Sequence, residues 1–329
     1  PVKLTGIILI IILFRVNLSG QDPSFSQFYA NRLYLNPGFT GIEKNIRRAF
    51  INYRNQWPSI SGNYVTYSAS YDQYIDHMHG GFGIRLMNDI QGNGTIRQFE
   101  LGLLYSYHIK ISRRFSVSAG IDASYAQRSL NTSDVVLGDM INPRTGEFTN
   151  PTGDILYSQN SAYPDFSVGM VGFYENFYGG ASVSHLLRPN PSVSSDPNAR
   201  LPRKVVLFAG GIIPVYERRL GKEVLQISPN LIYQQQKSFS QIIYGMEGVI
   251  QDQFILGIWL RQNLGIKFGS LIFSAGYVTK NYRFRYSYDQ QLSLPSVHIP
   301  NLGAHELSLI LTIDGKKKKK HRAIKCPKI

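Results

Sequence analysis

The sequence predicts an all-β protein, a transmembrane antiparallel β-barrel of about fourteen strands preceded by a cap or plug segment. One observation is a series of segments in which apolar and polar residues alternate, so that each predicted strand has one apolar and one polar face. Another is the composition, with 43% hydrophobic but only 17% charged residues. A third is the placement of every long connection at one end of the predicted sheet.

Residues 1–20 are expected to form a secretory signal peptide. Lys3 precedes an apolar run over 7–14, and the small residues Ser19 and Gly20 follow it. This order of charge, apolar core and small residues is typical of a cleaved signal, here cut near 20–21. The apolar core is about half as long as a spanning helix requires, which disfavours the alternative of a membrane anchor.

Residues 21–45 are predicted to be a cap or a plug in the lumen of the barrel rather than a strand. The stretch "QDPSFSQFYANRLYLNPGFTG" has neither strand alternation nor a helical stripe, and Asn36-Pro37-Gly38 reads as a turn. Its aromatic side chains would be poorly placed in free solvent, which disfavours a disordered leader. Arg54 and Glu306 are the expected partners for its backbone, since buried polar groups need pairing. The residues assigned to the cap or plug are Phe25, Phe28, Tyr29, Tyr34, Asn36, Pro37 and Phe39.

The barrel itself is expected over residues 46–314. The alternating segments are 46–57, 62–75, 80–90, 94–109, 112–127, 164–174, 177–188, 203–216, 222–236, 239–250, 253–267, 270–278, 282–290 and 303–314. An even strand number is usual in bacterial outer-membrane barrels.

The polar faces distinguish a membrane barrel from a soluble sandwich. They are small and serine-rich where a sandwich surface would carry more lysine, and the apolar faces end in tyrosines such as Tyr67, Tyr107 and Tyr125. Aromatic girdles at the two membrane interfaces have this appearance. Ile310 is the exception, an apolar residue on a polar face. A lumenal polar network is expected from Arg54, Asp72, Glu100, Asp122, Glu247, Arg283, Arg285 and Glu306.

The connections predict the orientation. The three long ones, 128–163, 189–202 and 291–302, all fall at the same end, and the connections at the other end are short. Outer-membrane barrels have short periplasmic turns and longer outer loops. An outer-membrane location with both termini in the periplasm follows. The longest loop is a candidate partner-facing surface, with Asp134, Asp139, Arg144 and Glu147 as its charged residues.

The excess positive charge is local. Eight of the fourteen excess charges lie in residues 316–329 and two more in residues 1–20, so the body of the chain carries only four. A nucleic-acid-binding surface is therefore not needed. Residues 315–329 are expected to be a basic periplasmic tail. Its Cys326 is the single cysteine, which excludes an intrachain disulfide.

No catalytic constellation is present, and neither an enzyme nor a cofactor is expected. The pair His77 and His79 lies in a short turn without further ligands, and the acidic residues of the longest loop lack calcium-loop spacing. Charged residues inside the barrel are read as mutually paired groups rather than a hydrolytic site.

Five stretches together resemble the PorP/SprF family of outer-membrane proteins of the Bacteroidota. They are "DPSFSQFYANRLYLNPGFTG", "NYRNQW", "YSASYD", "RYSYDQ" and "GAHELSL", in that order. The resemblance covers residues 21–313. It implies a barrel associated with type IX secretion and gliding, which supports export or surface retention of a large adhesin-like partner by recognising the partner's C-terminal domain. Contacts with other components of the secretion system are also implied, and outer-membrane lipid is the expected surrounding.

Two other functions remain open on the residues alone. One is an outer-membrane channel or transporter for a small ligand, with which a plug segment is compatible. The other is a barrel enzyme, disfavoured by the lack of a catalytic set.

Overall fold

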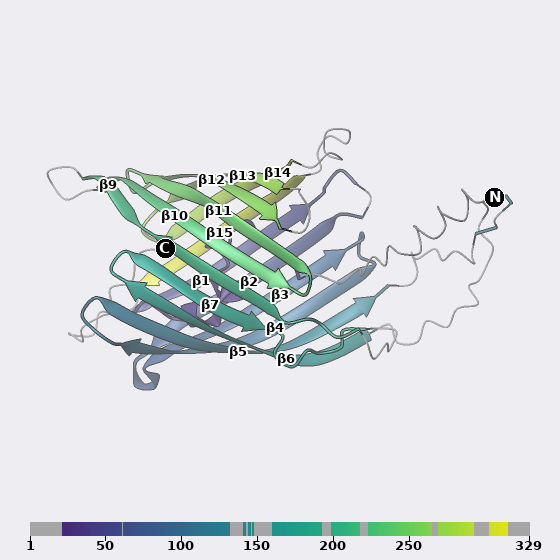
Figure 1. The fold of residues 1–329 in the computed structure, drawn as a ribbon, viewed down its shortest axis with the longest axis horizontal. Coiled ribbons are helices and arrows are strands. Elements are labelled where there is room, and N and C mark those ends of the chain that lie inside the picture. Colours follow the sequence, from purple (N-terminus) through teal and green to yellow (C-terminus); the bar gives the residue numbers. More distant parts are fainter. Residues whose placement is uncertain are drawn as a thin grey trace, which may run out of the picture.

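The strands close into one antiparallel barrel. The computed structural model describes residues 22–60, 62–131, 141–142, 144–145, 147, 160–192, 199–217, 223–264, 269–292 and 303–314. The strands are β1 (Ile46–Gln56), β2 (Tyr64–Ile75), β3 (Gly80–Gln91), β4 (Ile96–Lys110), β5 (Phe115–Leu130), β6 (Asn160–Tyr174), β7 (Phe177–Ser184), β8 (Lys204–Gly211), β9 (Ile213–Glu217), β10 (Glu223–Gln236), β11 (Phe239–Ile250), β12 (Phe254–Asn263), β13 (Gly269–Val278), β14 (Tyr282–Gln291) and β15 (Gly303–Asp314). Neighbours in sequence pair with one another, except β8 and β9, and β1 closes the ring on β15 (Figure 1).

The predicted number of fourteen barrel strands is confirmed. β8 and β9 both pair with β10 and form one strand interrupted at Ile212, so the fifteen segments correspond to fourteen barrel strands. The three predicted long connections join β5 to β6, β7 to β8 and β14 to β15, and all three lie at one end, called the long-loop end. The opposite end, where Asp76–Met78 (η2) joins β2 to β3, is the short-turn end.

The outer face of the barrel is apolar. Exposed and buried residues alternate along the strands, and the exposed ones include Leu103 (49%), Ile121 (54%), Leu256 (57%) and Phe273 (47%). So much apolar surface is unsuited to water and matches a hydrocarbon surrounding. Within the described residues no helix is both long and apolar enough to cross a membrane.

The inward face is serine-rich, as expected, but it is not uniformly polar. A band of apolar side chains crosses it at mid-height and surrounds residues 22–43, which are named the N-terminal segment. Ile310 belongs to this band and is 4% exposed. The inward apolar residues of the band are Phe50, Leu104, Val171, Phe173, Val206, Phe208, Ile232, Ile243, Trp259, Ile272 and Ile310.

The N-terminal segment runs through the lumen from the long-loop end to the short-turn end. Asp22 bonds to Gln236, at the long-loop end of β10. Arg32–Leu35 (α2) and Pro37–Phe39 (η1) follow at mid-height, and Gly41 lies against Gly81 near the short-turn end. The described chain therefore starts at the opposite end from Asp314. This differs from the expectation of both termini on the short-turn side, because the segment crosses the whole lumen before β1 begins.

Glycines on the barrel wall make room for the segment. A Cβ on Gly120 would lie 2.4 Å from the backbone carbonyl group of Pro37, and a Cβ on Gly81 would lie 2.1 Å from the carbonyl oxygen of Thr40. Contacts this short do not occur between real atoms, so the wall has no side chain where the segment approaches it most closely. Gly41 itself has φ +57, a left-handed conformation that other residues rarely adopt.

Gly120→Ala is predicted to displace the N-terminal segment while the barrel persists. The added methyl group meets backbone rather than a flexible side chain, and overpacking of this kind costs about 1–3 kcal/mol, or roughly 5- to 150-fold in the docking equilibrium. Arg32 is the one trypsin site within residues 22–41. Limited trypsin digestion should therefore cut after Arg32 faster in the variant than in the unsubstituted protein.

Gly172→Ala is the matched control, because a Cβ there meets Phe115 at an ordinary 3.5 Å. Equal cleavage rates after Arg32 in Gly120→Ala and Gly172→Ala would show that the segment is not held against Gly120.

Candidate functional site

The carboxylate of Glu306, on β15, anchors the first part of the N-terminal segment. It accepts the backbone N–H of Ser26 at 2.7 Å and that of Gln27 at 3.0 Å. The same carboxylate pairs with Arg54 at 3.0 Å, and Arg54 also pairs with Asp289 at 2.9 Å. Glu306 is fully buried, and such a charge is tolerated only with all its partners in place. The structure thus brings Arg54 and Glu306 together on the backbone of the segment.

Side chains of the segment complete this cluster. The hydroxyl of Ser26 donates to Asp289 at 2.6 Å and accepts from Arg261 at 2.7 Å. The amide of Gln27 donates to the hydroxyl of Ser287 at 3.0 Å and accepts from the hydroxyl of Ser308. Gln27 is 0% exposed. These bonds fix the position of the segment along β14 and β15.

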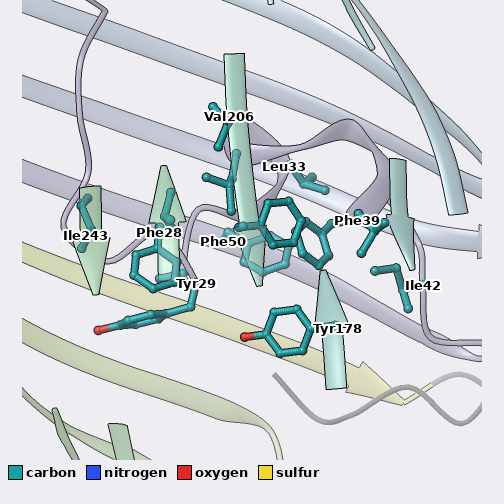
Figure 2. Close-up of a cluster of buried hydrophobic side chains, with 14 of the residues drawn as sticks. Phe28, Tyr29, Leu33, Phe39, Ile42, Phe50, Tyr178, Val206 and Ile243 are labelled. Atoms are coloured by element: carbon teal, nitrogen blue, oxygen red, sulfur yellow. The ribbon is translucent and has the colours of Figure 1, made fainter. Parts of the chain in front are cut away.

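Aromatic residues hold the segment at mid-height. Phe28 packs edge-to-face on Trp259 with ring centroids 5.1 Å apart, and Phe39 stacks on Phe208 at 5.2 Å. Figure 2 shows Phe28, Tyr29, Leu33, Phe39 and Ile42 of the segment among side chains of four strands, labelled Phe50, Tyr178, Val206 and Ile243. Each buried aromatic contributes about 1.5–3 kcal/mol relative to exposure, so this cluster is the main apolar contribution to docking.

Serines of the wall satisfy the carbonyl groups of the turn in the segment. The hydroxyls of Ser182, Ser118 and Ser106 donate to the carbonyl oxygens of Leu35, Gly38 and Thr40 at 2.8, 2.7 and 2.6 Å respectively. A short irregular segment cannot satisfy its own carbonyls, which gives the serine-rich faces of the strands a specific role.

Asn36 joins the turn to the wall. Its side-chain oxygen accepts the N–H of Gly38 at 2.7 Å, which caps η1, and its amide nitrogen donates to the carbonyl oxygen of Ala181 at 2.9 Å. Asn36 is 0% exposed, and Pro37 begins η1 with its ring in the first helical position. The "NPG" motif is therefore a turn that bonds both to itself and to β7.

Asp72 holds the end of the segment at the short-turn end. It accepts the backbone N–H of Gly41 at 2.7 Å, and it forms a two-bond pair with Arg48 at 3.1 and 3.2 Å. Arg48 also pairs with Glu43 at 2.9 Å. Carboxylates on β2 and β15 thus receive backbone N–H groups at both ends of the segment.

A second ion cluster fixes the start of the segment at the long-loop end. His185, just after β7, lies between Asp22 at 2.8 Å and Asp165 at 2.6 Å, and Lys204 lies 3.6 Å from Asp22. Burial lowers the pKa of His185, but Asp22 and Asp165 outweigh this effect and raise it to about 10. Burial likewise raises the pKa of Asp22, but His185 and Lys204 bring it well below its usual value. His185 is therefore a cation at neutral pH.

The remaining residues of the predicted lumenal network form separate pairs. Glu100 and Asp122 both bind Arg85, at 2.7 and 2.8 Å. Glu247 pairs with Arg285 at 2.6 Å. Arg283 also faces inward, but among the described residues no carboxylate lies within ion-pair distance of it. The network is thus several clusters rather than one.

The segment carries one cation of its own. Arg32, on α2, is 5% exposed and its guanidinium lies 5.0 Å from the ring centroid of Phe50.

The residues that were assigned to the cap or plug from the sequence differ little in their burial. Phe25, Phe28, Tyr29, Asn36, Pro37 and Phe39 are buried, and Tyr34 is half-buried with its hydroxyl donating to the carbonyl oxygen of Pro23. In the longest loop, Arg144 and Glu147 are exposed. Asp134, Asp139, Cys326 and the basic tail lie outside the described residues. Within the described part of the chain, no group of His, Cys, Asp and Glu side chains could hold a metal ion.

Several residues of the site were missed from the sequence. Ser26, Gln27, Asp289 and Arg48 make as many bonds to the segment or its anchors as the predicted residues do. The alternation along the strands could have indicated two of them. Asp289 lies an even number of positions from Arg285, and Arg48 an even number from Arg54, so each shares the inward face of its strand. Asp22 and His185 are brought together only by the path of the segment.

A cavity of about 510 Å³ lies at the long-loop end, above the start of the segment. Asp22, Pro23 and Ser24 line it, as do Trp57 and Tyr64. Nine amide side chains contribute to its wall, namely Gln56, Gln91, Gln98, Gln234, Gln235, Gln236, Gln241, Asn263 and Gln291.

Glu306→Ala is predicted to release the start of the segment. The substitution leaves the buried Arg54 with one carboxylate partner and two backbone N–H groups without any acceptor, a change that costs about 3–5 kcal/mol for a buried pair. Trypsin cleavage after Arg32 should accelerate by roughly 100-fold or more. Glu175→Ala is the control, because its partner Arg114 is 71% exposed and exposed pairs contribute about 0–1 kcal/mol. Cleavage in Glu306→Ala at the rate of Glu175→Ala would contradict the anchoring role.

The start of the N-terminal segment at Asp22 is predicted to detach from the wall at alkaline pH, because His185 then loses its charge. A pKa raised from 6.5 to about 10 means that the stabilisation is fully present below about pH 6.5 and is lost as the pH rises through about 10. A nitroxide on Ser24→Cys, in a Cys326→Ser background, should be immobile at about pH 8 and mobile at about pH 11.

His185→Gln should make the nitroxide mobile at both pH values, whereas His305→Gln, at a half-buried histidine bonded to Tyr286, should leave the response intact. An unchanged pH response in His185→Gln would assign the transition to another group.

Comparison with known proteins places the chain in a family. Residues 17–311 match the family described as "Type IX secretion system membrane protein PorP/SprF". No curated protein matches in sequence.

Solved structures that match this chain include a transporter, a channel and an outer-membrane protein. The Ralstonia pickettii toluene transporter TbuX has a TM-score of 0.48 at 10% identity, over 85% of this chain and 92% of that one. The CymD monoaromatic hydrocarbon channel has 0.47 at 10%, over 91% and 96%. The Acinetobacter baumannii protein Omp33 has 0.46 at 8%, over 83% and 100%. Because the family match spans most of the chain and includes every strand that anchors the N-terminal segment, the protein belongs to the PorP/SprF family of type IX secretion system membrane proteins.

Proposed function

We propose that the protein is a non-enzymatic outer-membrane barrel that supports export or surface retention of a large secreted partner by recognising the partner's C-terminal domain. In this role the barrel binds the partner and does not conduct solutes, because the N-terminal segment plugs its lumen. The family assignment supports a role in type IX secretion. The apolar outer face supports a location in the membrane.

The observation that carries the proposal is the way in which the lumen is occupied. The N-terminal segment spans the barrel from Asp22 to Gly41, with carboxylates bonded to its backbone near both ends. Any solute that crossed the barrel would have to displace buried ion pairs and an aromatic cluster. A barrel built in this way is suited to holding a partner at one end rather than to conducting solutes.

The long-loop end supplies the proposed docking surface. Outer-membrane barrels direct their long loops outward, which supports an orientation with the three long connections and the 510 Å³ cavity at the cell surface. An amide side chain has both donor and acceptor groups, so amides of the cavity wall such as Gln56 and Gln98 can bond to peptide groups of a partner. Trp57 and Tyr64 add amphipathic aromatic surface at the rim.

A channel for a small ligand is the second candidate, and the same cavity favours it. The cavity ends on residues 22–24, so transport requires the N-terminal segment to move.

Replacement of residues 131–159 by a short turn is predicted to release the secreted partner into the medium while the barrel remains in the outer membrane. Whole cells would be probed for surface partner, and the medium for released partner. The matched control replaces the turn 251–253 at the short-turn end, which should leave the partner on the surface. Full retention of the partner after the 131–159 replacement would contradict docking through this loop.

A further inference from the structure

Two inward-facing arginines in the short-turn half of the lumen, Arg32, which is buried, and Arg283, which is half-buried, lack acidic partners. Most buried arginines of the lumen bind a carboxylate, as Arg54 and Arg85 do. Arg32 and Arg283 do not, since no carboxylate of the described residues lies within ion-pair distance of either. The Nε of Arg32 also has no acceptor, although the side chain is about 95% buried.

The strand register brings these two arginines to one patch. Arg283 lies opposite Ile310, and Ile310 lies opposite Phe50, so the three residues form an inward row across β14, β15 and β1. The guanidinium of Arg32 lies over the ring of Phe50. Two strand spacings of about 4.8 Å separate the backbone of Arg283 from that of Phe50, a gap that the side chains of these two residues can span together.

The charge balance of this patch is positive. Its cations are Arg32, Arg48, Arg283 and Arg285, and its acids are Glu43, Asp72 and Glu247. Each acid is already bonded to Arg48 or Arg285. Lys44, stacked on Tyr74, adds a further cation at this end. The Glu306 cluster is balanced by comparison, with Arg54 and Arg261 against Asp289 and Glu306.

We propose that Arg32 and Arg283 form a binding site for an oxyanion, a carboxylate or a phosphate-like group with two or more charged oxygens. Planar guanidinium groups bind such oxygens through two parallel hydrogen bonds. Since Arg32 belongs to the N-terminal segment and Arg283 to β14, the bound anion joins the segment to the wall. Occupancy of the site therefore stabilises the docked segment. This site is independent of the proposed partner recognition at the long-loop end.

Two sources offer this chemistry. One is a free inorganic oxyanion, and the other is the carboxylate of a peptide that enters from the short-turn end. The probes are radiolabelled sulfate and a short uncharged peptide with a free C-terminal carboxylate, compared with the same peptide as its C-terminal amide.

The test is equilibrium dialysis of the full-length barrel, refolded in detergent, with sulfate at constant ionic strength. One saturable sulfate site per barrel is expected. Arg283→Gln and Arg32→Gln should each weaken the binding by at least about tenfold, the loss expected when one charge-assisted pair of hydrogen bonds is removed. Arg113→Gln removes a charge from an exposed turn at the same end and should bind like the unsubstituted protein.

Competition between bound sulfate and the two peptides distinguishes the two sources of the anion. Displacement of sulfate by the carboxylate peptide but not by its amide assigns the site to a peptide carboxylate, and no displacement by either assigns it to inorganic oxyanions. Bound sulfate should also slow trypsin cleavage after Arg32 in the unsubstituted protein and not in Arg283→Gln. The inference is overturned if neither sulfate nor the carboxylate peptide binds saturably, or if sulfate binding is undiminished in both arginine variants.

Discussion

The contact between Glu306 and the backbone of Ser26 and Gln27 determines how the interior is organised. A fully buried carboxylate needs compensation from several donors at once. Arg54 supplies the charge, the two backbone N–H groups complete the shell, and Asp289 balances Arg54 in turn. Since two of these donors belong to the N-terminal segment, the buried carboxylate of the barrel wall has all its partners only when the segment is docked. The apolar band and the wall glycines are consistent with the same requirement.

Of the five sequence stretches that resemble the PorP/SprF family, one is this segment and the other four meet around it. "HELSL" contributes Glu306 and Ser308, and "RYSYDQ" contributes Ser287 and Asp289. "NYRNQW" contributes Arg54. In "YSASYD", Ser68 accepts a hydrogen bond from Asn31, and Asp72 accepts one from Gly41. Stretches as far apart as 280 residues are therefore one structural unit, the segment and its receptor surface.

The strands could be predicted because period-2 alternation is a local property. Every expected strand is present, and the boundaries of most differ from the expected ones by only a few residues, as for β1 and β11. The separation of polar and apolar faces was also predictable, since Glu306 and Ser308 alternate with Leu307 and Leu309. Ile310 broke that pattern for a reason that is not local, because it packs in the apolar band around the segment.

Other features of the site could not be predicted because they depend on which residues face one another across the lumen. Arg54 and Glu306 could be proposed as partners of the segment, but the pairing of Ser26 with Asp289 and of Asp22 with His185 depends on the path of the segment. That path has no periodic pattern. It is fixed by wall glycines such as Gly120, whose significance appears only when the segment lies against them.

The most direct test of the central claim, that the N-terminal segment closes the barrel, is ion conductance in planar lipid bilayers. The refolded full-length protein would be compared with a chain that lacks residues 22–41, both reconstituted at the same protein-to-lipid ratio. Closure by the segment predicts no through-current in the full-length protein and stable, stepwise conductance in the shortened chain. Equal conductance of the two proteins, whether both conduct or neither does, would contradict closure by the segment.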